Sequence, residues 1–320
     1  MSIKKWAVLL LGAAILLPIL AGCTRHTDKV RIGTGGIGGT YAACGAALGE
    51  IFGAVFPEVP FEVKHTAGSA ANLRLMSDQY LELAITQSDV ADDAYHGTGV
   101  FRDKAYTGYS AVASLYTEAC QIVVRADSSI RTIDDLLGKK ISVGEEGSGV
   151  LYHAESILEC CGLPFDAVER CNLSYADAAK ALYEGTIDAF FCTAGAPTTA
   201  VAALAEKMPV RLLGLDDHQM ERLLATHQSY IPVLVPANTY PGQEQEVKTV
   251  GVRAILVAGN QLSQEEVYAF LSALNRNSKM IEKAAGAKWN FSQITAGITI
   301  PYHPGAIQFF EEHDIVITGG

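Results

Sequence analysis

Short apolar strands alternate with helical segments along most of the chain, and this alternation constrains the fold more than any other feature of the sequence. Strands are predicted at 30–34, 61–65, 83–86, 111–115, 120–124, a segment ending at 143, 188–192 and 250–257. In the first helical segment, the apolar residues recur at the spacing of one helix face: Cys44, Leu48, Ile51, Phe52 and Val55. We therefore predict an α/β protein whose mainly parallel sheets are flanked by helices.

The first residues of the chain predict a secretory signal. Lys4 and Lys5 precede an uncharged apolar stretch, 7–20, which is shorter than the about 20 residues that a membrane-spanning helix needs. Residues 20–23, Leu-Ala-Gly-Cys, resemble the bacterial lipobox, which implies cleavage before Cys23 and a lipid on its sulfur. An uncleaved anchor helix is the alternative. We expect an extracytoplasmic, lipid-anchored chain with residues 1–22 as signal peptide and 23–29 as anchor linker.

The charge balance excludes one class of partner. The chain has 24 Lys and Arg residues, 35 Asp and Glu residues and a net charge of −11, whereas a nucleic-acid partner requires a basic stripe. Six of the seven cysteines follow Cys23, and an extracytoplasmic location permits disulfides between them without specifying any pair. The sequence leaves open whether these cysteines form disulfides or are free thiols, and their spacing indicates no metal site.

Small or hydroxyl-bearing residues stand where several predicted strands end. In open parallel sheets, ligands bind outside the carboxyl ends of the strands. Each of these segments also leads into a helix, whose first N–H groups and positive dipole end favour an anion. They therefore predict a site for a small carboxylate that needs no arginine. The segments are Thr34-Gly35-Gly36, Gly68-Ser69, Gln87-Ser88, Gly147-Ser148-Gly149 and Thr193-Ala194-Gly195.

The glycine-rich segment 33–39 also suggests a nucleotide-binding loop. Its glycines match G-x-G-x-x-G, but the second strand ends in Lys64 and His65 instead of the acid that a dinucleotide site places there. No Gly-Lys-Ser/Thr follows the loop either, and a chain outside the cytosol has little access to such cofactors. A purely structural turn is the alternative to a cradle for a small polar ligand, which we favour. We predict no cofactor.

Residues typical of catalysis do not form a recognisable group. The eight histidines are scattered, and neither H-E-x-x-H nor G-x-S-x-G occurs. His303 lies in Tyr-His-Pro-Gly, which predicts a turn and a helix cap. The acidic pair Glu145–Glu146 is interpreted as a solvated surface. We predict no catalytic residue and no metal ligand.

Several segments, in order along nearly the whole mature chain, resemble one family. The sequence is similar to the TAXI-type solute receptors of TRAP (tripartite ATP-independent periplasmic) transporters. The segments that carry the resemblance are 32–41 (IGTGGIGGTY), 68–76 (GSAANLRLM), 83–97, 114–149, 185–197, 247–257 and 300–312.

This resemblance implies a two-lobed periplasmic binding protein of type II-like fold. Lobe 1 would comprise 30–119 and 253–320, and lobe 2 would comprise 120–252, with strands 120–124 and 250–257 as hinges. The lobes would close on a glutamate-like amino acid, a dicarboxylate or a 2-oxo acid, and would deliver it to membrane subunits driven by an ion gradient. A lipid-anchored sensor of the same fold, acting on a signalling partner, is the alternative.

Ligand-binding residues are predicted only where the chain matches the family's segments. For Thr40 a helix cap is the alternative role, for Tyr41 a place in the core, for Asn72 the bracing of a loop, and for the lobe 2 residues a tight strand-to-helix turn. Where the family usually has threonine after Ser148-Gly149, this chain has Val150, so we expect one polar contact to the ligand to be missing. The predicted residues are Gly36, Thr40, Tyr41, Ser69, Asn72, Gln87, Ser88, Ser148, Gly149, Thr193 and Gly195.

Overall fold

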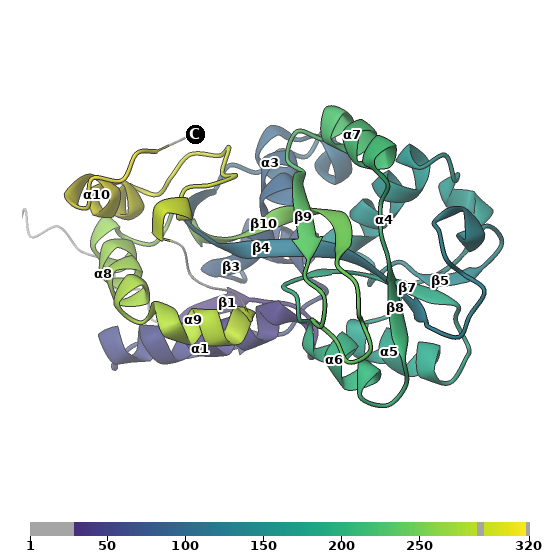
Figure 1. Ribbon diagram of the computed structural model, residues 1–320. Coiled ribbons are helices and arrows are strands. Elements are labelled where there is room, and N and C mark those ends of the chain that lie inside the picture. The colour runs from purple at the N-terminus through teal and green to yellow at the C-terminus, as the bar shows by residue number, and fades with distance from the viewer. Residues whose placement is uncertain (1–28, 287–290, 318–320) are drawn as a thin grey trace, which may run out of the picture.

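The computed structural model describes residues 29–286 and 291–317. These residues form one ten-stranded sheet in the order β2-β1-β3-β10-β4-β7-β5-β6, with β8 paired to β4 and β9 paired to β10. Helices cover this sheet in two groups, one around each end (Figure 1). The predicted α/β class is confirmed.

The first half follows the predicted alternation of strands and helices. Its strands pair in parallel, β1 with both β2 and β3, and each leads into a helix on the strand's carboxyl side. The elements are β1 (Val30–Gly33), α1 (Thr40–Val55), β2 (Phe61–Lys64), α2 (Ser69–Ser77), β3 (Leu83–Gln87) and α3 (Ser88–His96). The predicted apolar face of α1 is buried at Cys44, Leu48, Ile51 and Phe52.

Two long strands, β4 (Tyr109–Arg125) and β10 (Val247–Gly259), run antiparallel through the middle of the molecule (Figure 1). The prediction of separate strands at 111–115 and 120–124 was wrong, because β4 is continuous. From Ala119 onward β4 pairs with β7, and β10 changes partner from β9 to β3 between Gly251 and Ala254. These changes fall at the proposed lobe boundaries, 119/120 and 252/253.

The second half repeats the pattern, with β5 parallel to both β6 and β7. Because β4 and β10 are antiparallel to their neighbours, the sheet is mixed, and the predicted parallel pairing holds only for the outer strands of each half. The elements are β5 (Lys140–Ser142), α4 (Gly149–Cys160), β6 (Glu169–Cys171), α5 (Tyr175–Tyr183), β7 (Ala189–Ala194), α6 (Thr199–Ala205), β8 (Val210–Leu213), α7 (Asp217–Thr226) and β9 (Ile231–Val235).

After β10 the chain returns to the first half. Figure 1 shows α8 (Gln264–Arg276) and α9 (Ser278–Ala285) beside α1, and α10 (Pro304–Glu312) packed on α8. The predicted cap at His303 is confirmed, since its Nδ1 accepts the Gly305 N–H at 3.2 Å. Four 3₁₀ turns complete the described elements: Gly99–Phe101, Asp134–Leu136, Phe165–Ala167 and Phe291–Gln293.

Each half has its own apolar core. One cluster in the first half joins residues from distant segments, such as Leu48, Ile85 and Phe310. Two clusters in the second half contain alternate residues of β4, with Val124 in one and Val123 in the other, because successive side chains of a strand point to opposite faces. No helix among the described residues is long and apolar enough to cross a membrane.

Candidate functional site

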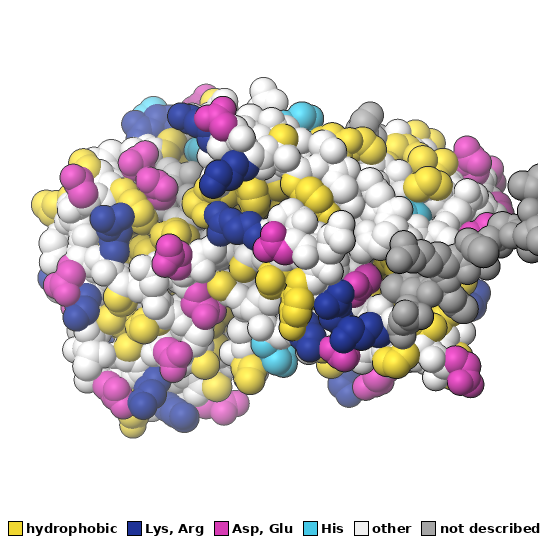
Figure 2. All heavy atoms as spheres, turned by 180° about the vertical axis from the view of Figure 1, so that it is seen from behind, with side chains coloured by type: hydrophobic (Ala, Val, Ile, Leu, Met, Phe, Trp, Pro, Cys, Tyr) yellow, Lys and Arg dark blue, Asp and Glu magenta, His cyan; other side chains and the backbone are white. Residues whose placement is uncertain are grey.

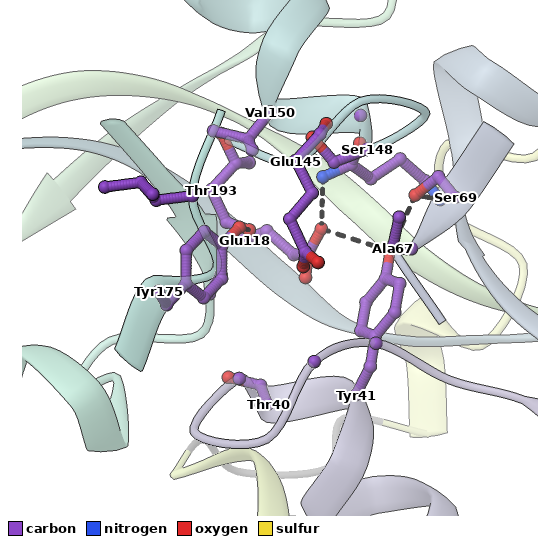
Figure 3. Close-up of a pocket in the computed structure, with 18 residues that line it drawn as sticks. Thr40, Tyr41, Ala67, Ser69, Glu118, Glu145, Ser148, Val150, Tyr175 and Thr193 are labelled. Carbon is purple, nitrogen blue, oxygen red and sulfur yellow. Dashed lines mark hydrogen bonds between the residues drawn. The ribbon is translucent and has the colours of Figure 1, made fainter. Parts of the chain in front are cut away.

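A cavity of about 50 Å³ lies where the loops of the two halves meet (Figure 3). Its walls are the segments that the sequence analysis identified at strand ends, together with the middle of β4. The lining residues are Gly35, Gly36, Gly39, Thr40, Tyr41, Ala67, Gly68, Ser69, Gln87, Glu118, Glu145, Ser148, Gly149, Val150, Leu173, Tyr175, Thr193 and Ala194.

The glycine loop between β1 and α1 approaches the second half of the molecule closely. A Cβ on Gly39 would lie 3.5 Å from the ring of Tyr175, and one on Gly38 would lie 3.5 Å from the Cβ of Ala200. The Gly38 carbonyl also accepts the Ala200 N–H at 3.2 Å, and the Gly147 carbonyl accepts the Ala71 N–H at 3.0 Å. The bare backbone of the loop therefore serves close packing between the halves as well as the cavity.

Helices α1 and α2 begin at the cavity without a side-chain cap. The expectation that Thr40 caps α1 was wrong, because Gly39 occupies the cap position and Thr40 is the first helical residue. By contrast, the Ser148 hydroxyl caps α4 by accepting the Leu151 N–H at 3.4 Å. The uncapped N–H groups and positive dipole ends of α1 and α2 offer a place for a carboxylate.

Glu118 of β4 is the buried acid of the cavity and is 1% exposed. One oxygen, Oε2, accepts the Gln87 amide at 2.8 Å and the Tyr41 hydroxyl at 3.3 Å; Figure 3 shows Tyr41 reaching toward it from the start of α1. Within the described part of the chain, Oε1 receives no hydrogen bond. Burial raises the pKa of this carboxyl group to about 8.

The cavity contains a second carboxylate and no basic side chain among the described residues that line it. Glu145, interpreted from the sequence as solvated, is half-buried and comes within 3.2 Å of the Cβ position of Gly36. Burial, with Asp177 nearby, raises the pKa of Glu145. Gln87 adds a buried acceptor, since its Oε1 has no hydrogen-bond partner. The polar side chains of this site are thus suited to a ligand that donates hydrogen bonds.

Eight of the predicted ligand-binding residues line the cavity: Gly36, Thr40, Tyr41, Ser69, Gln87, Ser148, Gly149 and Thr193. Three do not. Gly195 instead packs against the opposite half, where a Cβ added to it would lie 2.7 Å from the Ala285 carbonyl oxygen. Ser88 begins α3 with a buried, unpartnered hydroxyl. Asn72 is fully occupied in joining strands.

Sequence reasoning missed Glu118 and Tyr175. A signal for Glu118 existed, because it is a single acid inside the apolar run from Tyr109 to Val124, and a buried charge of this kind is rare without a specific partner. Tyr175 gave no such signal. Val150, where we expect a polar contact to the ligand to be missing, also lines the cavity.

Substitution of Asn72 tests whether this residue binds ligand or braces the loops and strands around it. Its amide donates to the carbonyls of Thr34 and Ile85 at 2.7 and 2.8 Å and accepts from Thr66 at 2.6 Å. Asn72→Ala leaves these buried groups unpaired, so we expect the free energy of unfolding to fall by about 3 kcal/mol. Chemical denaturation would measure this, with the exposed Ser77→Ala of the same helix as the control. An unchanged midpoint for Asn72→Ala would contradict the bracing role.

The structure also bears on the metal, disulfide and nucleic-acid sites considered in the sequence analysis. Among the described residues no cluster of three or more His, Cys, Asp or Glu side chains could hold a metal ion. The cysteines in this part of the chain are free thiols: Cys44, Cys120, Cys160, Cys161, Cys171 and Cys192. On the face shown in Figure 2, acidic and basic side chains are interspersed without a continuous basic stripe.

The mixed sheet, the two strands that pass from one half to the other and the cavity between the halves define a periplasmic binding protein fold of type II. Residues 32–313 match the NMT1-like family, and the chain belongs to this family.

Solved structures with a similar fold are known at low sequence identity. An ancestral arginine-binding protein bound to glutamine is 14% identical, with a TM-score of 0.51 over 82% of this chain and 99% of that one. The periplasmic aliphatic sulphonate binding protein SsuA from Escherichia coli is 18% identical, with a TM-score of 0.48 over 90% and 84%. The GluR0 ligand-binding core from Nostoc punctiforme, in complex with L-glutamate, is 15% identical, with a TM-score of 0.48 over 79% and 98%. By description, these three are binding proteins or a ligand-binding core.

Proposed function

We propose that this chain is the solute-binding receptor of a transporter, of the TAXI type that its sequence resembles, and that it binds a small amino acid between two closing lobes. The observation that carries this proposal is the placement of buried Glu118 opposite the uncapped starts of α1 and α2, in a cavity walled by both halves. The ligand would pass to membrane subunits driven by an ion gradient.

The polarity of the cavity favours an amino acid over the other predicted ligands. The ligand carboxylate would lie against the N–H groups of α1 and α2, and its ammonium group would pair with Glu118. A dicarboxylate or a 2-oxo acid has no ammonium group. Its second polar end would face Glu118 and Glu145, and no lining Lys or Arg would compensate a second negative charge there.

The small size of the cavity supports closure of the lobes. Its volume is about 50 Å³, and we propose that a ligand enters while the halves are further apart. The ligand favours the closed state because only there does it contact both halves.

The proposed location rests on the N-terminus. The signal peptide at 1–22 and the lipidated Cys23 lie outside the described residues, and so does most of the linker 23–29. We propose an extracytoplasmic chain held to a membrane by its lipid, as the lipobox-like segment implies.

A thermal-shift panel tests the proposed ligand class. The chain from Thr24 onward would be heated with L-glutamate, L-glutamine, smaller neutral L-amino acids, 2-oxoglutarate, succinate and, as a nucleotide, ATP. An amino acid at 100 times its Kd should add about 2.7 kcal/mol to the stability of the folded state and raise Tm by several degrees. A larger shift with 2-oxoglutarate or succinate would refute the amino-acid assignment. A shift with a nucleotide alone would refute the receptor proposal.

A further inference from the structure

One ion pair joins the two halves of the molecule beside the cavity. Asp89 lies in the first turn of α3, and His153 lies in α4 of the opposite half. The Nε2 of His153 is 2.8 Å from the Oδ2 of Asp89, with side chains 1% and 20% exposed. Neither residue lines the cavity, and neither was predicted as a site residue.

Both ring nitrogens of His153 have a hydrogen-bond partner. Nε2 faces the Asp89 carboxylate, and Nδ1 is 3.0 Å from the Thr193 hydroxyl oxygen. The Thr193 hydroxyl also lies 3.5 Å from the sulfur of Cys120. Burial alone lowers the pKa of His153, but the Asp89 carboxylate outweighs it and raises that pKa well above its ordinary value.

We propose that Asp89 and His153 form a latch between the lobes, which holds the closed state by a charged hydrogen bond and makes closure depend on pH. Thr193 connects the latch to the cavity, because its hydroxyl bonds His153 and it also lines the wall. Asp89 follows Gln87 and Ser88 directly, at the point where β3 leads into α3. Asp89 and His153 are positioning residues, since they would act on closure without touching the ligand. The inference rests on the proposed closure of the lobes.

The direction of the pH effect follows from the ion pair. In the closed state the Asp89 carboxylate raises the pKa of His153; in the open state His153 would lose this partner, and its pKa would return toward the ordinary value of about 6.5. The latch therefore contributes fully below about pH 6.5 and weakens as pH rises toward the closed-state value, by at most tenfold per pH unit for one proton.

Other titratable groups face the pair from neighbouring elements. Glu118 and Cys120 approach His153 from β4, and His227 and Tyr230 approach it from the segment between α7 and β9. Asp93 of α3 lies near Asp89. Because ionisation of buried Glu118 also disfavours the closed state at higher pH, the pH series is best measured in the Glu118→Gln background.

Hydrogen exchange measures closure without any ligand. The amides of Ala71 and Ala200 donate across the cleft, to Gly147 and Gly38, whereas those of Ser114 and Val143 donate within one half. Asp89→Asn and His153→Gln should each lower the protection of the two cross-cleft amides by about 10- to 100-fold at pH 6. Protection at Ser114 and Val143 should stay unchanged.

The pH series and a matched control complete the test. Corrected for intrinsic exchange, cross-cleft protection should fall with pH when His153 is present and be flat in His153→Gln. His227→Gln changes a nearby histidine outside the ion pair and should behave like its parent. Unchanged cross-cleft protection in Asp89→Asn and His153→Gln, or an equal loss at Ser114 and Val143, would overturn the latch. Because no ligand is present, these outcomes are independent of the proposed amino-acid specificity.

Discussion

Glu118→Gln is expected to weaken amino-acid binding by about 100-fold or more. The substitution keeps the shape of the side chain but removes the charge that would pair with the ligand ammonium group, and loss of one partner of a buried ion pair costs about 3–5 kcal/mol. Isothermal titration calorimetry with the amino acid giving the largest thermal shift would measure the change. Glu145→Gln is the matched control, since Glu145 is only half-buried, and should cost less than about fivefold.

The pH dependence of amino-acid affinity is a second test of the role of the Glu118 carboxyl group. With a pKa of about 8 in the closed cavity, Glu118 is mostly protonated at pH 6 and must lose its proton to pair with an ammonium group. This contribution to affinity should therefore rise with pH up to about 8 and vanish in Glu118→Gln. Its direction is opposite to that of the Asp89–His153 latch. Unaltered affinity in Glu118→Gln would mean that the ammonium group lies elsewhere.

Gly195→Ala is expected to weaken ligand binding by about 30-fold while leaving each half folded. The added Cβ would lie 2.7 Å from the backbone oxygen of Ala285 and 3.3 Å from the side chain of Thr40, both in the opposite half. A backbone oxygen cannot rotate away as a side chain can, so the halves must separate slightly, at a cost of about 2 kcal/mol. Titration calorimetry would measure the affinity, and small-angle scattering with ligand would report the expansion.

Gly53→Ala is the control for Gly195→Ala. Gly53 lies in α1 with no atom within 4 Å of its Cβ position, so alanine there should leave ligand affinity unchanged and stabilise the helix by up to about 1 kcal/mol. Equal affinities for the two variants would show that Gly195 does not limit closure.

Local patterns predicted most of the elements, whereas the pairing of strands required the structure. Helix α1 was predicted from its apolar face, which the structure buries at Cys44, Leu48, Ile51 and Phe52. Strand β9 was missed because Pro232 interrupts it, which is tolerated at the edge of a sheet. Strand β4 was divided in two because Thr117 and Glu118 interrupt its apolar run. Glu118 is buried because β4 passes from one half to the other at this point, beside the cavity.

The site was partly predictable for a similar reason. Strand ends supply small and hydroxyl-bearing residues that local sequence can identify, and eight of the predicted residues line the cavity. Asn72 is a residue type common in ligand contacts, but here its side chain joins the end of β1 to β3 and also accepts from Thr66. Nothing in the local sequence separates these two uses of an asparagine, since the difference lies in which carbonyls the fold brings near it.

The passage of both β4 and β10 from one half to the other has a consequence for the order in which the chain folds. Ala119 and Gly251 are register partners, so the whole second half is inserted between two neighbouring positions of the first. The sheet of the first half needs β10 between β3 and β4, and the ribosome makes β10 only after most of the second half. The inserted lobe can therefore become compact first, as domains commonly fold in units. The lobe that begins at the N-terminus finishes last, when its returning strand closes the central gap.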